Sequence, residues 1–190
     1  MRKNLSFAGE RMVVVDRLSE LEGESFDYLF AFEVLEHIRQ DREVLREWMR
    51  YLKPGGRLLI SVPAHQRKFG RSDELVGHVR RYEKDELRAL LSGSGVADIE
   101  IVNYGFPITE LTRRLSNRLV KNDHSYDEMT HEQRSVRSAQ ARPAVINKAL
   151  SLASGNLFTP FRFVQRWFYR YDLGDGYVAS GIKCPSLIMS

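Results

Sequence analysis

Two apolar runs on either side of an amphipathic segment constrain the fold of this chain more than any other feature. The first run is FDYLFAF, residues 26–32, and the second is RLLISVP, residues 57–63. Between them, over residues 34–52, apolar side chains recur with the 3.6-residue period of a helix, which ends at Pro54 and the two glycines that follow. This order of strand, helix and strand predicts a mostly parallel α/β sheet. The near-continuous apolar character of the first run predicts a strand buried on both faces.

The rest of the chain extends this pattern and then changes it. No convincing strand is expected over residues 107–170, where amphipathic, polar and aromatic segments follow one another. We therefore expect one domain, residues 1–190, with a helical insertion at residues 107–170 before the last strand. The remaining expected elements are strands at residues 11–15, 98–106 and 176–183 and helices at residues 84–91 and 108–120.

Composition places the chain among ordinary globular proteins. Hydrophobic residues make up 43% and charged residues 28%, which suffices for a core. A net charge of +4 is too small to predict a nucleic-acid partner. The single cysteine, Cys184, excludes an internal disulfide, and no apolar run reaches 18 residues. Because the first residues also lack an apolar leader, we expect a cytoplasmic protein.

The stretch FAFEVLEHI sets Glu33, Glu36 and His37 within five residues, directly after the first apolar run. Acidic side chains near a helix N-terminus are favoured by the helix dipole, so a plain helix start is one interpretation. An active site at the end of a buried strand is the other. The residues of this stretch alone leave both interpretations open.

Several motifs occur in one order around this stretch: Asp16 after an apolar run, FDYLFAFEVLEHI, YLKPGGRLLISVP and GHVRRYEKDEL. Together they resemble the later half of a class I S-adenosylmethionine-dependent methyltransferase. The resemblance is close over residues 12–106 and looser over the last strand. It implies a Rossmann-like fold and methyl transfer from S-adenosylmethionine to a small-molecule or lipid-linked acceptor, the molecule that receives the methyl group.

The resemblance also implies roles for the residues at the cofactor. Asp16 stands where the family has a carboxylate that accepts a hydrogen bond from the adenine amino group, and the backbone of Arg17 and Leu18 would face the ring edge. Phe32 and Glu33 stand beside the methionine portion and the transferred methyl group. The LKPGG turn is structural in this family and is not a phosphate loop.

On the acceptor side, the resemblance makes His37 a candidate general base, with Glu36 as its catalytic companion, because imidazole titrates in the useful range. The E-x-x-E-H spacing is also similar to one that holds a divalent metal in some quinone-type O-methyltransferases, but we assign no metal on this ground. A solvated loop is the competing interpretation of GHVRRY. The candidate acceptor-binding residues are His65, His78, Arg80 and Arg81, the arginines being suited to an anionic group.

One part of the family pattern is missing. The glycine-rich G-x-G-x-G turn after the family's first strand and the acidic residue after its second strand are not found; the first glycine is Gly9. We therefore expect a sheet that is incomplete at the N-terminus and weak or absent binding of S-adenosylmethionine. A fragment of a longer gene product is the favoured explanation. The others are residues 11–15 pairing beside the 26–32 strand, or a second chain that fills the gap.

Two further expectations concern partners. Aromatic and basic residues interleave over residues 158–171, which suits core packing, contact with a membrane surface or a nucleic-acid surface, of which we favour core packing. A dimer also stays open. The alternative to an enzyme is a non-catalytic methyltransferase-like protein that binds a partner through the remaining sheet and this aromatic segment.

Overall fold

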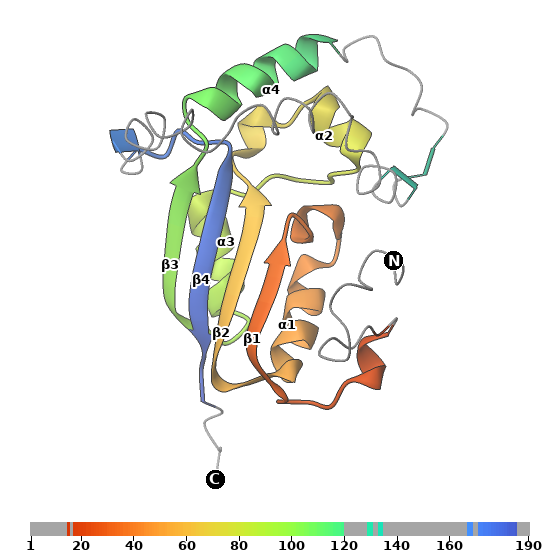
Figure 1. Ribbon diagram of the computed structural model, residues 1–190, viewed down its shortest axis with the longest axis vertical. Coiled ribbons are helices and arrows are strands. Elements are labelled where there is room, and N and C mark those ends of the chain that lie inside the picture. Colours follow the sequence, from red (N-terminus) through yellow and green to blue (C-terminus); the bar gives the residue numbers. More distant parts are fainter. Residues whose placement is uncertain are drawn as a thin grey trace, which may run out of the picture.

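The structure, a computed structural model, describes residue 15 and residues 17–119, 129–130, 133–134, 167–168 and 171–185. Four strands form one sheet, with helices on one face and across one end (Figure 1). The strands are β1 (Phe26–Phe32), β2 (Leu52–Pro63), β3 (Val96–Tyr104) and β4 (Gly176–Lys183). The helices are α1 (Asp41–Tyr51), α2 (Arg71–Val76), α3 (Lys84–Ser92) and α4 (Ile108–Leu119), with short 3-10 turns η2 (Leu18–Glu20), η3 (Leu35–His37) and η4 (Gln66–Lys68).

The strand order is β1-β2-β4-β3. β1 and β2 are parallel, whereas β4 is antiparallel to both of its neighbours, β2 and β3. Three strands therefore point the same way, and the last strand of the chain runs back between two of them. The predicted α/β class is confirmed, and the last strand occupies the predicted residues.

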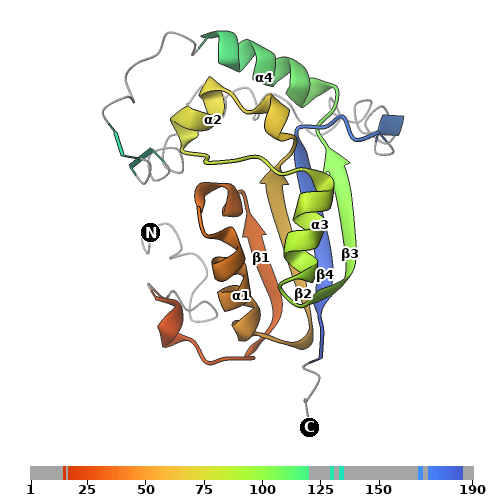
Figure 2. The same cartoon turned by 180° about the vertical axis from the view of Figure 1, so that it is seen from behind.

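Helices α1 and α3 cover one face of the sheet, as the view from behind shows (Figure 2). Alternate side chains of β2 point into this interface, so that Leu58, Ile60 and Val62 are almost completely buried. Their partners include Leu45 of α1 and Leu87 of α3. This layer is the hydrophobic core, and it fixes the ends of β1 and β2 relative to each other.

The opposite face of the sheet is not covered by any described element. The register places Tyr28, Phe30 and Phe32 on this face, beside Arg57 and Leu59 of β2. The three aromatic side chains stack in a row and are 53–60% exposed. The prediction that β1 is buried on both faces is therefore wrong. In the described part of the chain β1 is an edge strand, and only its Leu29 and Ala31 side packs against the core.

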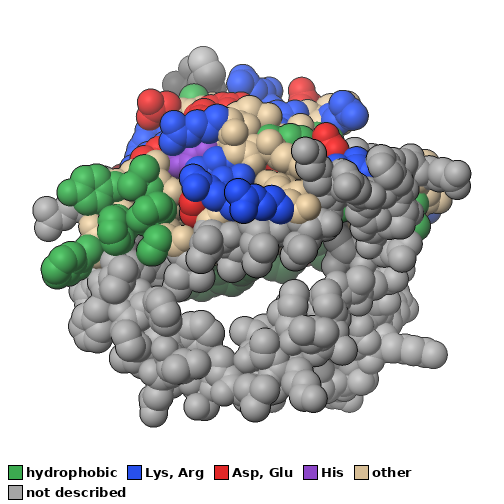
Figure 3. All heavy atoms as spheres, turned by 90° about the horizontal axis from the view of Figure 1, so that it is seen from above, with side chains coloured by type: hydrophobic (Ala, Val, Ile, Leu, Met, Phe, Trp, Pro, Cys, Tyr) green, Lys and Arg blue, Asp and Glu red, His purple; other side chains and the backbone are tan. Residues whose placement is uncertain are grey.

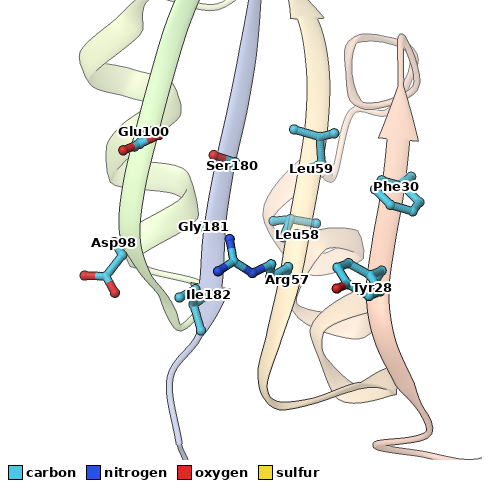
Figure 4. Close-up of a pocket in the computed structure, with 10 residues that line it drawn as sticks. All are labelled: Tyr28, Phe30, Arg57, Leu58, Leu59, Asp98, Glu100, Ser180, Gly181 and Ile182. Carbon is cyan, nitrogen blue, oxygen red and sulfur yellow. The ribbon is translucent and has the colours of Figure 1, made fainter.

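A shallow groove of about 370 Å³ crosses this open face (Figure 4). Arg57 lies in its middle, between aromatic side chains of β1 and the acidic side chains Asp98 and Glu100 of β3. The groove lies away from the ends of the strands, where the predicted site residues gather.

The segment after β1 also departs from the prediction of one helix over residues 34–52. Glu33 has a positive φ of 53°, and η3 is a single turn held by i to i+3 hydrogen bonds. Ile38 is extended, and the α-helix begins only at Asp41. The break turns the side chain of Glu36 inward, whereas a continuous helix would carry it along the surface of α1.

Most of the predicted insertion, residues 107–170, lies outside the described residues. Its first part is α4, close to the predicted helix at residues 108–120. Helices α4 and α2 lie together across the end of the sheet where β1, β2 and β3 finish (Figure 1). Among the described residues, no helix has both the length and the apolar character needed to cross a membrane.

Candidate functional site

The predicted catalytic residues lie just beyond the carboxyl end of β1. The main-chain N–H of Glu33 donates to the carbonyl oxygen of Ser61 (3.0 Å), which extends the pairing of β1 and β2 by one residue. The turn η3 follows, with Glu36 fully buried. The carbonyl oxygen of Glu36 accepts a 2.8 Å hydrogen bond from the N–H of Val79, so the turn is joined to the loop after α2.

This loop brings His78 next to two residues that lie about forty positions earlier in the chain. Nε2 of His37 and Nε2 of His78 each lie 3.8 Å from Oε1 of Glu36. The two rings meet edge to face, with centroids 4.8 Å apart. We refer to Glu36, His37 and His78 as the Glu-His-His cluster. Seen from above, histidine side chains reach the surface among lysine and arginine side chains at this end of the molecule (Figure 3).

Each imidazole is oriented through its other nitrogen. Nδ1 of His37 is 2.8 Å from the carbonyl oxygen of Gly77, to which it must donate. Nδ1 of His78 is 3.0 Å from Oδ1 of the buried Asp73. Burial alone would raise the pKa of Asp73, but the hydrogen bond from His78 and the charge of Arg81 outweigh it, so this pKa lies below its ordinary value. Asp73 is therefore a carboxylate that holds His78 in place.

Glu36 has the opposite electrostatic setting. Its burial, and then the nearby negative charge of Glu33, raise its pKa to about 8. Neither carboxyl oxygen has a hydrogen-bond partner among the described residues. A buried carboxyl group without partners is costly to fold, and groups of this kind are frequent at functional sites.

Glu33 forms the boundary between the cluster and the end of β1. Its Oε1 accepts from the hydroxyl of Ser61 (2.8 Å) and from that of Tyr104 (3.3 Å), at the ends of β2 and β3. Burial and the charge of Glu33 raise the pKa of Tyr104, so the phenol keeps its proton and donates. Ser61, Tyr104 and Asp73 were not predicted from the sequence. The positions of Ser61 and Tyr104 near strand ends could have pointed to them, whereas Asp73 lies within α2.

The two arginines of GHVRRY have partners within the chain. Arg80 donates to Asp41 and to the carbonyl oxygen of Arg39, both at 2.8 Å. Arg81 is buried and forms ion pairs with Asp73 (2.9 Å) and Asp175 (3.0 Å). Both guanidinium groups are therefore held by partners within the chain, and the predicted grip on an anionic acceptor stays a prediction. They fix the loop that carries His78.

His65 is also a supporting residue in this geometry. Its side chain is 3% exposed, so it does not face an open cleft. Nδ1 lies 3.3 Å from Glu83, Nε2 lies 3.5 Å from Asp172, and the ring packs edge to face against Tyr177. These contacts join the end of β2 to the start of β4.

Two of the predicted cofactor residues lie at a groove of about 430 Å³ along the outer edge of β1. Leu18 and Phe32 line it, together with Trp48 and Tyr51 of α1, and Glu33 follows Phe32 directly. Arg17 is exposed, and its N–H donates to Glu20 at the start of η2. Asp16 and residues 11–14 of the predicted first strand lie outside the described residues.

The volume and lining of this groove suit a flat aromatic ring. Its volume is in the usual range for small-molecule sites, and its aromatic and aliphatic lining suits a flat adenine ring. The only polar side-chain groups among its lining residues are the hydroxyl of Tyr28 and of Tyr51 and the indole N–H of Trp48. Partners for the two ribose hydroxyls and for the charged methionine end are not among the described lining residues.

Residues 2–60 match the family described as a methyltransferase domain. No protein with a curated function matches the sequence of the chain. Among solved structures, the chain is similar to phosphoethanolamine N-methyltransferase 2 of Haemonchus contortus in complex with S-adenosylmethionine, with 19% identity and a TM-score of 0.46. That match covers 87% of this chain and 35% of the other.

Two further solved structures are similar at comparable levels. A methyltransferase of Thermotoga maritima has 15% identity and a TM-score of 0.48, over 86% of this chain and 58% of the other. A methyltransferase of Archaeoglobus fulgidus has 12% identity and a TM-score of 0.46, over 96% and 73%. The chain thus spans less than two thirds of the length of the first two. The motifs and the family match agree that residues 2–60 are similar to the methyltransferase domain family.

Proposed function

We propose that this chain provides the acceptor side of an S-adenosylmethionine-dependent methyltransferase. The observation that carries the proposal is the Glu-His-His cluster at the carboxyl end of β1. It follows closely after Phe32, which lines the groove. Ligands of open α/β sheets bind at the carboxyl ends of strands. A site with histidines, a carboxyl group of raised pKa and an adjacent groove suits a reaction that removes a proton from its substrate.

In methyl transfer the cofactor supplies an electrophilic methyl group to a lone pair of the acceptor. The residues of this chain would hold the acceptor in line and take its proton, and positioning alone is a large part of such catalysis. His37 and Glu36 are the candidate proton acceptors. Glu33, held by Ser61 and Tyr104, would separate the cofactor groove from the cluster and present a negative charge toward the cationic cofactor.

The acceptor we propose is a small or lipid-linked molecule that enters beneath α2 and α4. α4 is fixed above the end of the sheet by Glu110, which forms ion pairs with Lys68, Arg113 and Arg114. Beside it, Phe168 packs against Phe106 (centroids 4.8 Å apart), whereas Trp167 is 80% exposed. An exposed tryptophan in the 158–171 segment favours the membrane-surface alternative for this segment.

The second candidate function is a non-catalytic methyltransferase-like protein that binds a partner protein through its sheet. The row of exposed aromatic side chains at Tyr28, Phe30 and Phe32 favours it, because large exposed apolar patches usually mark contact surfaces. Binding of the cofactor distinguishes the two candidates.

The chain contains its own reporter for that test. Trp48 lines the groove, and the second tryptophan, Trp167, is removed by a Trp167→Phe substitution. Titration of this variant with S-adenosylmethionine should quench the fluorescence of Trp48 with weak but saturable binding, because the lining contacts only part of the cofactor. Methionine alone, without the adenine ring, is the control ligand. No change up to millimolar cofactor would refute the proposal and favour the binding protein.

A further inference from the structure

Three nitrogen and oxygen donors converge at the Glu-His-His cluster. One ligand atom each of Glu36, His37 and His78 lies within 4.8 Å of the other two. Glu36 is fully buried, and the histidine side chains are 21% and 14% exposed. The carboxyl group is therefore closed off from solvent, whereas each imidazole is partly exposed.

The orientation of the rings fixes which nitrogens face Glu36. A neutral imidazole that donates through Nδ1 carries its ring lone pair on Nε2. Nδ1 of His37 is bound to the carbonyl oxygen of Gly77, and Nδ1 of His78 to the carboxylate of Asp73. The Nε2 atoms and the carboxyl oxygens of Glu36 thus face one another, an arrangement that a cation between them would stabilise.

In this geometry a proton on Glu36 cannot join the carboxyl group to either imidazole through a direct hydrogen bond. The oxygen lies 3.8 Å from either Nε2, beyond hydrogen-bond length. The same spacing suits an ion between the donors. With metal–ligand distances of about 2.0–2.1 Å, tetrahedral donors lie about 3.3 Å apart, so binding needs Glu36 and each histidine to approach by about 0.5 Å and the two histidines to approach by up to about 1.5 Å.

The partners around the rings match those of metal-bound histidines. Such histidines almost always donate their second N–H to a carboxylate or a backbone carbonyl, which fixes the ring and raises its basicity. His78 with Asp73 has the first arrangement and His37 with Gly77 has the second. Glu33, by contrast, is occupied by Ser61 and Tyr104, so the donor set differs from the E-x-x-E-H spacing considered from the sequence.

We propose that Glu36, His37 and His78 bind one divalent transition-metal ion. Two imidazole nitrogens and one carboxylate favour ions such as Zn²⁺ or Co²⁺ over Mg²⁺, which prefers oxygen ligands and water. Three protein ligands leave at least one coordination position open for water or for an oxygen of a second molecule. At this position the ion would bind an oxygen or nitrogen of the acceptor and lower its pKa, and in this metal-bound form Glu36 and His37 would act as ligands and not as proton acceptors.

The metal site rests on the geometry of these side chains and does not depend on the proposed methyl transfer. It can therefore be tested without cofactor and without acceptor, so that either proposal can fail alone. The probe is Co²⁺, whose visible absorption reports the coordination number and the presence of nitrogen ligands, and Zn²⁺ should displace it. The protein is the full chain after treatment with a chelator.

The background control is a His124→Gln, His131→Gln double variant. Its remaining histidines are the two of the cluster and His65. This variant should bind one equivalent of Co²⁺ as the unchanged chain does. Glu36→Gln and His78→Ala should lower the affinity at least about tenfold, since even the loss of an outer partner of a metal site commonly costs 10–100-fold. Circular dichroism shows whether each variant is folded.

A measurement on the unchanged chain covers the case in which a variant fails to fold. With ¹⁵N-labelled histidine, one equivalent of Zn²⁺ should shift the Nε2 resonances of two histidines while Nδ1 keeps its proton. Saturable binding with these shifts supports the proposal. No shift, equal affinity in a folded Glu36→Gln variant, or preference for Mg²⁺ over Zn²⁺ overturns it.

Discussion

Replacement of Glu110 by glutamine tests how α4 is held over the site. Glu110 accepts from Arg113 (2.7 Å) and Arg114 (2.8 Å) within α4, and it faces the buried ammonium group of Lys68 at 3.2 Å. Burial alone would raise its pKa, but the hydrogen bonds from Lys68 and Arg113 outweigh it and lower the pKa from 4.5 to about 2. This difference corresponds to at most about 3 kcal/mol, and screening by solvent reduces the stabilisation at neutral pH to about 1–2 kcal/mol.

The sign of the pH dependence follows from the lowered pKa. The unfolded chain binds the proton first, so the stabilisation is fully present above about pH 4.5 and is lost as the pH falls from 4.5 toward 2. Glu110→Gln should therefore lower the free energy of unfolding by about 1–2 kcal/mol at pH 7. The difference from the unchanged chain should shrink steadily below pH 4.5.

Urea unfolding followed by circular dichroism at pH 7, 5, 4 and 3.5 measures the loss of unfolding free energy at pH 7 and its decrease at lower pH. The exposed Glu43 of α1 provides a matched control, and Glu43→Gln should change the free energy of unfolding by less than about 0.5 kcal/mol. A Glu110→Gln difference below 1 kcal/mol at pH 7, or one that does not change with pH, would refute the proposed role of the Glu110 ion pairs.

Three further substitutions test other parts of the structure. Tyr82→Phe removes the buried hydroxyl that donates to Asp41 (2.9 Å) and should lower the free energy of unfolding by about 1–3 kcal/mol, measured by urea unfolding; an unchanged midpoint would contradict this. Gly174→Ala places a methyl group against the backbone of Tyr104 and should cost about 1–3 kcal/mol in the same measurement, whereas a neutral effect would show that this loop is packed differently. Phe30→Ser, at a side chain that is 60% exposed, should cost less than about 1 kcal/mol; a loss above 2 kcal/mol in the thermal or urea transition would show that the open sheet face is covered in solution.

The elements that the sequence predicts well are those with a strong local pattern. β1 and β4 have the predicted bounds, and α4 differs by one residue. The start of α1 was missed because the periodic apolar residues continue through η3, while a positive φ at Glu33 and an extended Ile38 break the helix. Apolar character alone also failed for β1, since burial depends on which elements cover the sheet.

The site was predicted in part for a similar reason. Local spacing identified Glu36 and His37 but cannot show that His78 joins them, because the loop after α2 is placed by tertiary contacts of Arg80 and Arg81. Those arginines carry the same charge whether they bind a ligand or a neighbouring carboxylate. Only the structure shows that their partners are Asp41, Asp73 and Asp175.

The central claim is that the carboxyl end of β1 is the meeting point of cofactor and acceptor. Amide resonances of a ¹⁵N-labelled chain, followed during addition of S-adenosylhomocysteine to millimolar concentration, test it most directly. The account predicts shifts at Leu18, Phe32 and Glu33, around the groove along β1. Shifts confined to the groove around Arg57 on the open sheet face, or no shifts at all, would contradict it.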